Sequence, residues 1–200
     1  GDTAGAVEQA SEGPDGGGAA PIATIPQVGS DDADAYGTVT ITGGSLPRLD
    51  GDFDAAIGMP IPNLTGSDFE GNRVEITDDG RAKIIVFLAH WCPYCQQELP
   101  ALTEWYTANA DNYPNVELIT VTTSIDEARG NPLEPYLDEL QLSFPAIVDA
   151  DLSLAEQFGA SAFPFWVFTA PDGSTLLRVA GFLGVEQVAE IFDQLNTLST

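Results

Sequence analysis

The sequence predicts an α/β fold in which helices pack on a central mixed β-sheet. Two observations support this prediction. Short apolar or alternating segments typical of strands are interspersed with helical segments over most of the chain. Near the C-terminus, Asp172-Gly173 marks a turn between two strand-like segments, and a helical segment follows them. Strands that alternate with helices and then end in a hairpin and a helix are typical of an α/β sandwich around a mixed sheet.

The first part of the chain differs in composition from the rest. Residues 1–35 are mainly Gly, Ala, Asp, Glu and Pro, and they have too few large apolar side chains to offset the entropy of ordering. We therefore expect residues 1–35 to form a disordered acidic linker and residues 36–200 to form one folded domain. No apolar run reaches the roughly 18 residues that a membrane span needs. The chain starts without a signal peptide, and an acidic leader of this kind is what a truncated membrane tether would leave.

The expected elements of the domain follow in chain order. Residues 38–42 alternate as a strand does, and residues 69–74 predict a strand, a tight turn and a strand, so a β-hairpin should precede the central strand. Residues 84–89 are continuously apolar, as a strand buried on both faces should be. A helix should follow to about Asn109. The remaining expected elements are strands at 116–121, 144–148, 165–169 and 175–179, and helices at 133–142, 152–158 and 185–198.

The only two cysteines, Cys92 and Cys95, are two residues apart where the apolar strand gives way to the helix. Unpaired backbone N–H groups and the helix dipole favour an anion at a helix N-terminus, so Cys92 is the candidate nucleophile as a thiolate. Cys95 is one turn further into the helix and is the candidate thiol that resolves a mixed disulfide. The pattern predicts a redox-active dithiol.

A purely structural or metal-binding role for the two cysteines is less favoured. A structural disulfide across a four-residue ring would contribute about 2 kcal/mol, against about 3 kcal/mol for a fifteen-residue loop. A zinc site needs four ligands, whereas the chain has two Cys and one His. We therefore expect no metal site of this kind. Two unrelated buried thiols remain an open alternative.

Residues 87–100, with the sequence FLAHWCPYCQQELP, resemble the active-site segment of the TlpA/ResA-type extracytoplasmic thiol:disulfide oxidoreductases, also called redoxins. The resemblance extends from about Ile57 to the C-terminus. It implies a thioredoxin-like fold with an N-terminal β-hairpin extension, and no cofactor beyond the redox-active disulfide of Cys92 and Cys95. Glutaredoxins also carry Pro-Tyr between their cysteines, but they are shorter and lack the preceding Trp.

The resemblance also implies roles for residues around the dithiol. Pro164 should be a cis-proline packed against the dithiol, and Phe163 should present its backbone to an extended substrate and give the groove an apolar rim. Glu98 should have a raised pKa and accept the Cys95 proton, unless it lies on a solvated helix face. The expected catalytic residues are Cys92, Cys95 and Glu98, and the expected substrate-binding residues are Trp91, Pro93, Tyr94, Phe163 and Pro164.

The net charge of −25, from 31 acids and 6 bases, excludes some partners. No basic patch can form to bind nucleic acid, and anionic membrane surfaces are disfavoured. The acidic field also opposes the Cys92 thiolate. His90, the only histidine, could stabilise the thiolate as a cation, but adjacent strand residues point opposite ways, so packing or a backbone hydrogen bond is the favoured role.

The resemblance implies protein thiols and disulfides as substrates, and a membrane-borne thiol partner that supplies or accepts electrons. It places the protein on the periplasmic or cell-surface side, tethered through a segment outside this chain. Reduction of the substrate is favoured, and a disulfide-forming oxidase of the same fold is the alternative. A Sco-type copper metallochaperone would have a wider Cys spacing and a distant His. A peroxiredoxin would carry Thr where this chain has Ala89.

Overall fold

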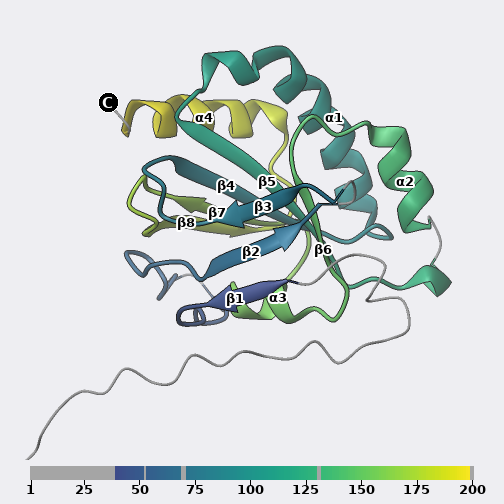
Figure 1. The fold of residues 1–200 in the computed structure, drawn as a ribbon, viewed down its shortest axis with the longest axis horizontal. Coiled ribbons are helices and arrows are strands. Elements are labelled where there is room, and N and C mark those ends of the chain that lie inside the picture. The colour runs from purple at the N-terminus through teal and green to yellow at the C-terminus, as the bar shows by residue number, and fades with distance from the viewer. Residues whose placement is uncertain (1–38, 52, 69–70, 130–131, 199–200) are drawn as a thin grey trace, which may run out of the picture.

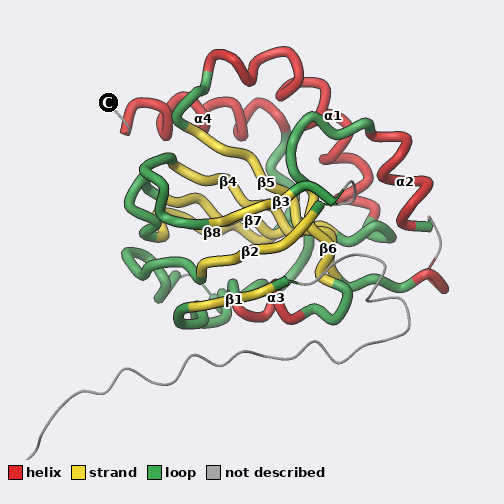
Figure 2. Tube along the Cα trace, in the orientation of Figure 1, coloured by secondary structure: helices red, strands yellow, loops and turns green. Residues whose placement is uncertain are grey.

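A computed structural model describes residues 39–51, 53–68, 71–129 and 132–198. The predicted linker of residues 1–35 lies outside the described residues. Figure 1 shows the described part as a central β-sheet with helices on both faces, and Figure 2 separates its helices, strands and loops by colour. The prediction of an α/β fold with a mixed sheet is confirmed.

The central sheet has five strands in the order β6-β5-β4-β7-β8. Its middle strand, β4, pairs with β5 in parallel and with β7 in antiparallel orientation. β6 is parallel to β5, and β8 is antiparallel to β7. The strands are β4 (Ala82–Leu88), β5 (Val116–Thr123), β6 (Ala146–Asp149), β7 (Phe165–Thr169) and β8 (Thr175–Ala180). All five lie within a few residues of their predicted ranges.

Helices α1, α2 and α4 lie over one face of this sheet, and α3 lies over the other (Figure 1). The alternate residues of β4 supply both layers, because every residue of this strand is buried. Ile84 and Val86 pack with α1 and α4, whereas Ile85 and Phe87 pack on the opposite side. The helices are α1 (Pro93–Asn109), α2 (Leu133–Leu140), α3 (Ser153–Gln157) and α4 (Val185–Leu198), with short 3-10 turns at Ala110–Asn112 and Glu127–Arg129.

A second, three-stranded antiparallel sheet packs on the face of the central sheet that carries α3. It comprises β1 (Thr40–Thr42), β2 (Asn63–Ser67) and β3 (Arg73–Ile76). The predicted hairpin is therefore present, but its first strand lies earlier than expected, and residues 69–70 are outside the described part. The inward positions of β2 are Leu64 and Gly66, so only one of them carries the apolar signal on which the prediction depended.

A buried ion pair ties the segment between β1 and β2 to the central sheet. The Arg178 guanidinium on β8 pairs with the Asp54 carboxylate and donates to the carbonyls of Pro47 and Phe158, both at 2.8 Å. The chain passes so closely here that a Cβ on Gly159 would lie 2.3 Å from the Pro47 oxygen. Only glycine fits this position. The sequence did not predict this close approach of Pro47 and Gly159.

Candidate active site

The dithiol lies at the carboxyl end of β4, in the centre of the sheet. Cys92 is the N-cap residue of α1, with an extended backbone (φ −78°, ψ 121°), and Pro93 occupies the first helical position. Proline is favoured there because its missing N–H would have no partner in the helix. The Cys92 carbonyl accepts from the Gln96 N–H at 3.0 Å, which begins the helical hydrogen-bond ladder. The predicted placement of Cys92 at a helix start is confirmed.

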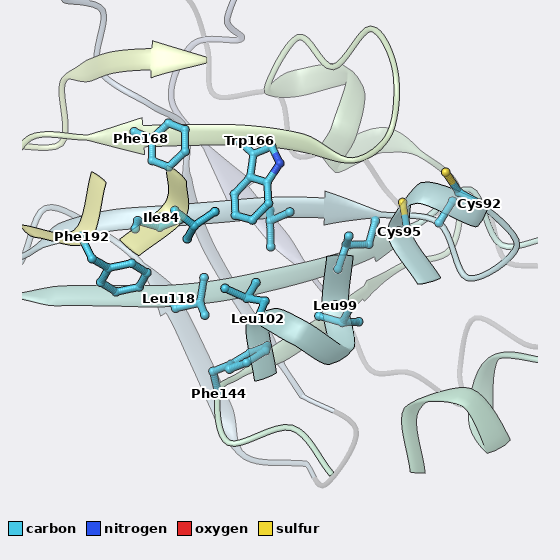
Figure 3. Packing of buried hydrophobic residues seen from close by; sticks show 14 of the residues in the cluster. Ile84, Cys92, Cys95, Leu99, Leu102, Leu118, Phe144, Trp166, Phe168 and Phe192 are labelled. Carbon is cyan, nitrogen blue, oxygen red and sulfur yellow. The ribbon is translucent and has the colours of Figure 1, made fainter. Parts of the chain in front are cut away.

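The two thiols differ in burial. Cys92 is 7 % exposed and Cys95 is fully buried, and neither is in a disulfide. Both belong to the apolar layer between α1 and the sheet, and Figure 3 shows them at its edge, beyond Leu99 and Trp166. Burial raises the pKa of the Cys95 thiol, and negative charge on Cys92 and Glu98 raises it further. Cys92 is therefore the thiol that a substrate reaches first.

The loop before β7 faces Cys92. The Phe163–Pro164 peptide bond is cis, and the Cys92 thiol donates to the Phe163 carbonyl with an Sγ to oxygen distance of 3.6 Å. Pro164 is buried, and its carbonyl accepts from the Gly181 N–H at 2.7 Å. The Phe163 side chain is half-buried and contacts the apolar layers on both sides of the sheet. The structure thus brings the backbone of Phe163 beside the outer thiol.

Glu98 lies on α1 one turn after Cys95 and is only 2 % exposed. Its two carboxylate oxygens accept hydrogen bonds from the N–H groups of Leu183 and Gly184, both at 2.9 Å. Burial raises the pKa of this carboxyl, and the two backbone hydrogen bonds offset only part of the shift. The alternative of a solvated helix face is therefore wrong for Glu98. The loop between β8 and α4 covers it instead.

The residues before Cys92 hold the loop that follows β5. The Trp91 indole Nε1 donates to the Ser124 carbonyl at 2.7 Å, and Trp91 is half-buried. The buried His90 accepts at Nε2 from the Asp126 N–H at 3.0 Å. This contact is the backbone hydrogen bond that the sequence favoured for His90, rather than a contact with the Cys92 sulfur.

The profile of the AhpC/TSA family matches residues 57–174, which is more than half of the chain and includes the dithiol and Pro164. The chain belongs to the AhpC/TSA family. Among its relatives, thiol-disulfide oxidoreductase ResA of Bacillus thuringiensis subsp. konkukian is 24 % identical over 141 residues, which cover 70 % of this chain and 79 % of the relative. The resemblance to ResA-type proteins that the sequence suggested is confirmed.

A second relative is also a thiol-disulfide oxidoreductase by name, and a solved structure identifies the fold. Sporulation thiol-disulfide oxidoreductase A of Bacillus subtilis is 26 % identical over 121 residues, which cover 60 % of this chain and 72 % of the relative. A thioredoxin-family thiol:disulfide interchange protein from Chlorobium tepidum TLS superposes with a TM-score of 0.59 at 19 % identity, covering 72 % of this chain and 99 % of that structure. The fold is thioredoxin-like, with the small N-terminal sheet as an addition.

The predicted substrate-binding residues do not all lie in one contact group. Pro93 and Tyr94 are exposed, and Tyr94 has 61 % of its surface open to solvent. Phe182, which follows Gly181 in the loop beside Pro164, is a further exposed aromatic residue that the sequence did not single out. Exposed aromatic side chains therefore lie both at the start of α1 and in the β8–α4 loop.

Tyr136 on α2 is a second residue that the sequence pattern did not single out. It is 9 % exposed and belongs to the same apolar layer as the two cysteines. Its hydroxyl is buried and has no hydrogen-bond partner within the described part of the chain. Burial raises the pKa of Tyr136, and charge on Cys95 and Cys92 raises it further, so the phenol is electrostatically coupled to both thiols. The sequence predicted a helix at residues 133–142 but gave no indication that Tyr136 lies in the layer with the two cysteines.

The described residues contain neither a metal-binding cluster nor a membrane-spanning helix. Across the described ranges, no three His, Cys, Asp or Glu side chains gather closely enough to hold a metal ion. None of the described helices is both long enough and apolar enough to cross a membrane.

Proposed function

We propose that this protein is a thiol:disulfide oxidoreductase that exchanges disulfides with the cysteines of other proteins through Cys92 and Cys95. The observation that carries the proposal is the unequal placement of the two thiols. Cys92 caps α1 and lies 3.6 Å from the Phe163 carbonyl, whereas Cys95 is enclosed behind it. An outer nucleophile with an inner resolving thiol is the arrangement that stepwise disulfide exchange needs.

In the reductive direction, the Cys92 thiolate attacks one sulfur of a substrate disulfide. A Cys92–substrate disulfide forms, the substrate disulfide breaks, and one substrate thiolate leaves and takes up a proton. Cys95 then loses its proton and attacks the Cys92 sulfur, which releases the second substrate thiolate. Two electrons pass to the substrate, and the Cys92–Cys95 disulfide that remains is the only redox group that the reaction requires. The oxidative direction is the reverse of these steps.

We assign Glu98 as the group that accepts the Cys95 proton. Its raised pKa brings the carboxyl closer to the range in which it can exchange protons near neutral pH, and its charge acts on Cys95 directly. Each carboxylate oxygen has two lone pairs, so Glu98 can take a proton while its oxygens still accept from the N–H groups of Leu183 and Gly184. The β8–α4 loop thereby positions the proton acceptor.

We assign the substrate groove to the surface between Tyr94, Phe163 and Phe182. The exposed rings of Tyr94 and Phe182 supply apolar contacts, and the backbone of Phe163 lies beside the reactive sulfur. An extended protein segment can pair with such a backbone while its side chains occupy the apolar rim. Trp91, Pro93 and Pro164 shape the remaining walls of the groove.

We further propose that the protein acts outside the cytoplasm, tethered through a segment beyond this chain, and reduces its substrates with electrons from a membrane-borne thiol partner. Its resemblance to TlpA/ResA-type proteins supports the location and the direction. A measured reduction potential of the Cys92–Cys95 pair decides the direction. A value near that of thioredoxin, about −270 mV, supports a reductase, and a value near about −120 mV supports an oxidase.

Trapping of mixed disulfides tests the exchange mechanism. Cys95→Ser should accumulate a stable mixed disulfide between Cys92 and a protein or peptide disulfide, because the resolving thiol is absent. Cys92→Ser should trap none, and the double variant controls for thiol-independent adducts. Mass spectrometry after acid quenching measures the adduct. Equal trapping by Cys95 in the Cys92→Ser protein would refute the assignment of the two roles.

A further inference from the structure

The six basic side chains of this acidic protein are not placed alike. Five of them have a carboxylate partner, and these five are Arg48, Arg73, Arg81, Lys83 and Arg178. Arg129 is the exception among the described residues, where its guanidinium has no carboxylate partner.

Arg129 stacks on the residue that precedes Cys92. Its guanidinium carbon is 3.3 Å from the centroid of the Trp91 ring, which is a close cation–π contact, and the residue is exposed. Trp91 directly precedes Cys92, and the Cα atoms of adjacent residues are about 3.8 Å apart. The guanidinium therefore lies against the residue that directly precedes Cys92, whose sulfur a substrate reaches first.

Three hydrogen bonds hold the segment that carries Arg129. The Trp91 indole and His90 Nε2 bind Ser124 and Asp126 at 2.7 and 3.0 Å. The Arg129 N–H in turn donates to the Asp126 carbonyl at 3.0 Å. The segment is thus attached to the residues on the amino side of Cys92, so the position of the guanidinium is set before a substrate arrives.

With a net charge of −25, the protein as a whole repels anions. A cation stacked on Trp91, the residue before Cys92, has a local effect of the opposite sign. The planar guanidinium presents paired N–H donors that match the two oxygens of a carboxylate. We propose that Arg129 is a specificity-determining residue that favours disulfide substrates with a carboxylate beside the reacting sulfur.

This inference rests on the proposed function, because it concerns the same exchange step. The Cys92 thiolate attacks the substrate sulfur, a Cys92–substrate disulfide forms and a substrate thiolate leaves. The carboxylate next to that sulfur binds Arg129 over the Trp91 ring during the attack. The cation takes no part in the electron transfer and changes only the affinity for the approaching disulfide.

Three small disulfides of similar size test the proposal: dithiodiglycolate, a dianion; hydroxyethyl disulfide, which is neutral; and cystamine, a dication. The rate of oxidation of the reduced full chain is measured by acid quenching, alkylation and mass spectrometry. Arg129→Gln should slow the reaction with dithiodiglycolate about three-fold, speed the reaction with cystamine by a similar factor and leave the neutral probe unchanged. These effects should shrink at high salt.

Arg73→Gln is the matched control, because it makes the same change in net charge. Arg73 pairs with Glu75 on the small N-terminal sheet, with 68 % of its side chain exposed, so its loss should alter all three rates only slightly. Cooperative unfolding of both variants in urea confirms that they are folded.

Two results would overturn the proposal. Equal slowing with all three probes would mean that Arg129 supports the thiolate and selects nothing. Unchanged rates would mean that it only packs on Trp91. A failure of the proposed function looks different, because the wild-type pair would then not react with the neutral disulfide at all.

Discussion

Ionisable side chains near the two ends of β4 differ in whether they have partners of opposite charge. At the amino end, the Lys83 ammonium is buried and pairs with the carboxylates of Asp79 and Glu117. Arg81 binds the same two carboxylates at 2.8 and 3.0 Å. At the carboxyl end, Cys95 and Glu98 are buried, and within the described residues neither has a basic partner.

The pKa values follow this division. Burial alone would raise the pKa of Asp79, but hydrogen bonds from Lys83 and Arg81 outweigh it and lower the value to about 2. Asp149, at the carboxyl end of β6, is bound by the Thr123 hydroxyl and two backbone N–H groups, and burial raises its pKa to about 6. Compensated charges hold one end of the sheet together. At the other end, burial without a basic partner raises the pKa values of the Glu98 and Asp149 carboxyls.

Loss of Lys83 should give the largest effect on stability. Lys83→Met keeps the length of the side chain but leaves Asp79 and Glu117 with one cation fewer, so the free energy of unfolding should fall by about 3 kcal/mol. Arg73→Met, at an exposed ion pair, should lose less than about 1 kcal/mol. Urea unfolding measures both. An equal loss in the two variants would mean that the buried pair contributes no more than a surface pair.

Asp149 should make stability depend on pH in the direction opposite to that of Asp79. Its pKa is about 6 in the folded protein against an ordinary value of 3.8. The folded state therefore holds this proton more tightly, so the contribution is fully present below pH 3.8 and is lost as the pH rises through 6. The loss amounts to about 3 kcal/mol, at 1.36 kcal/mol per pKa unit.

Asp149→Asn should remove that pH dependence, whatever its effect on absolute stability. The comparison is the difference in free energy of unfolding between wild type and variant at about pH 4 and about pH 7. As the pH rises, the free energy of unfolding of the variant should increase relative to that of the wild type. A constant difference would place the Asp149 pKa near its ordinary value.

Glu98→Gln should have a smaller effect on stability and a specific effect on the exchange reaction. A Gln side chain places an NH2 donor where one carboxylate oxygen accepted, so one of the N–H groups of Leu183 and Gly184 faces a donor, and a loss of about 1–2 kcal/mol should follow. The rate of mixed-disulfide resolution should fall and lose the pH-dependent step that Glu98 causes in the wild type. Glu104→Gln, exposed on the same helix, is the matched control. Superimposable pH–rate profiles would remove Glu98 from the proton pathway.

Tyr136→Phe should have the smallest effect on the free energy of unfolding, and it should raise it rather than lower it. The hydroxyl is buried without a partner in the described structure, so its removal should stabilise the protein by about 1 kcal/mol. Thermal or urea unfolding of the reduced protein measures the change. A loss of stability would show that the hydroxyl has a hydrogen-bond partner after all.

The features near the carboxyl end of β4 differ in whether the sequence could predict them. Residues 84–89 and the two cysteines carry local signals, an apolar run and a fixed spacing, and they predicted the buried strand and the helix start correctly. The hydrogen-bond partners of Glu98 carry no local sequence signal. Leu183 and Gly184 bind the carboxylate through backbone N–H groups, which every residue except proline has. The structure places the first strand of the hairpin at Asn63–Ser67, earlier than predicted, and Gly66 at an inward position of that strand carries no apolar signal.

The sequence by itself determined the alternation of strands and helices and the position of Cys92 at the start of α1. These features depend on the spacing of apolar residues and on interactions within one turn of a helix, which are local. Only the tertiary structure decided that Glu98 is buried, that His90 is a hydrogen-bond acceptor, and that Arg129 stacks on Trp91.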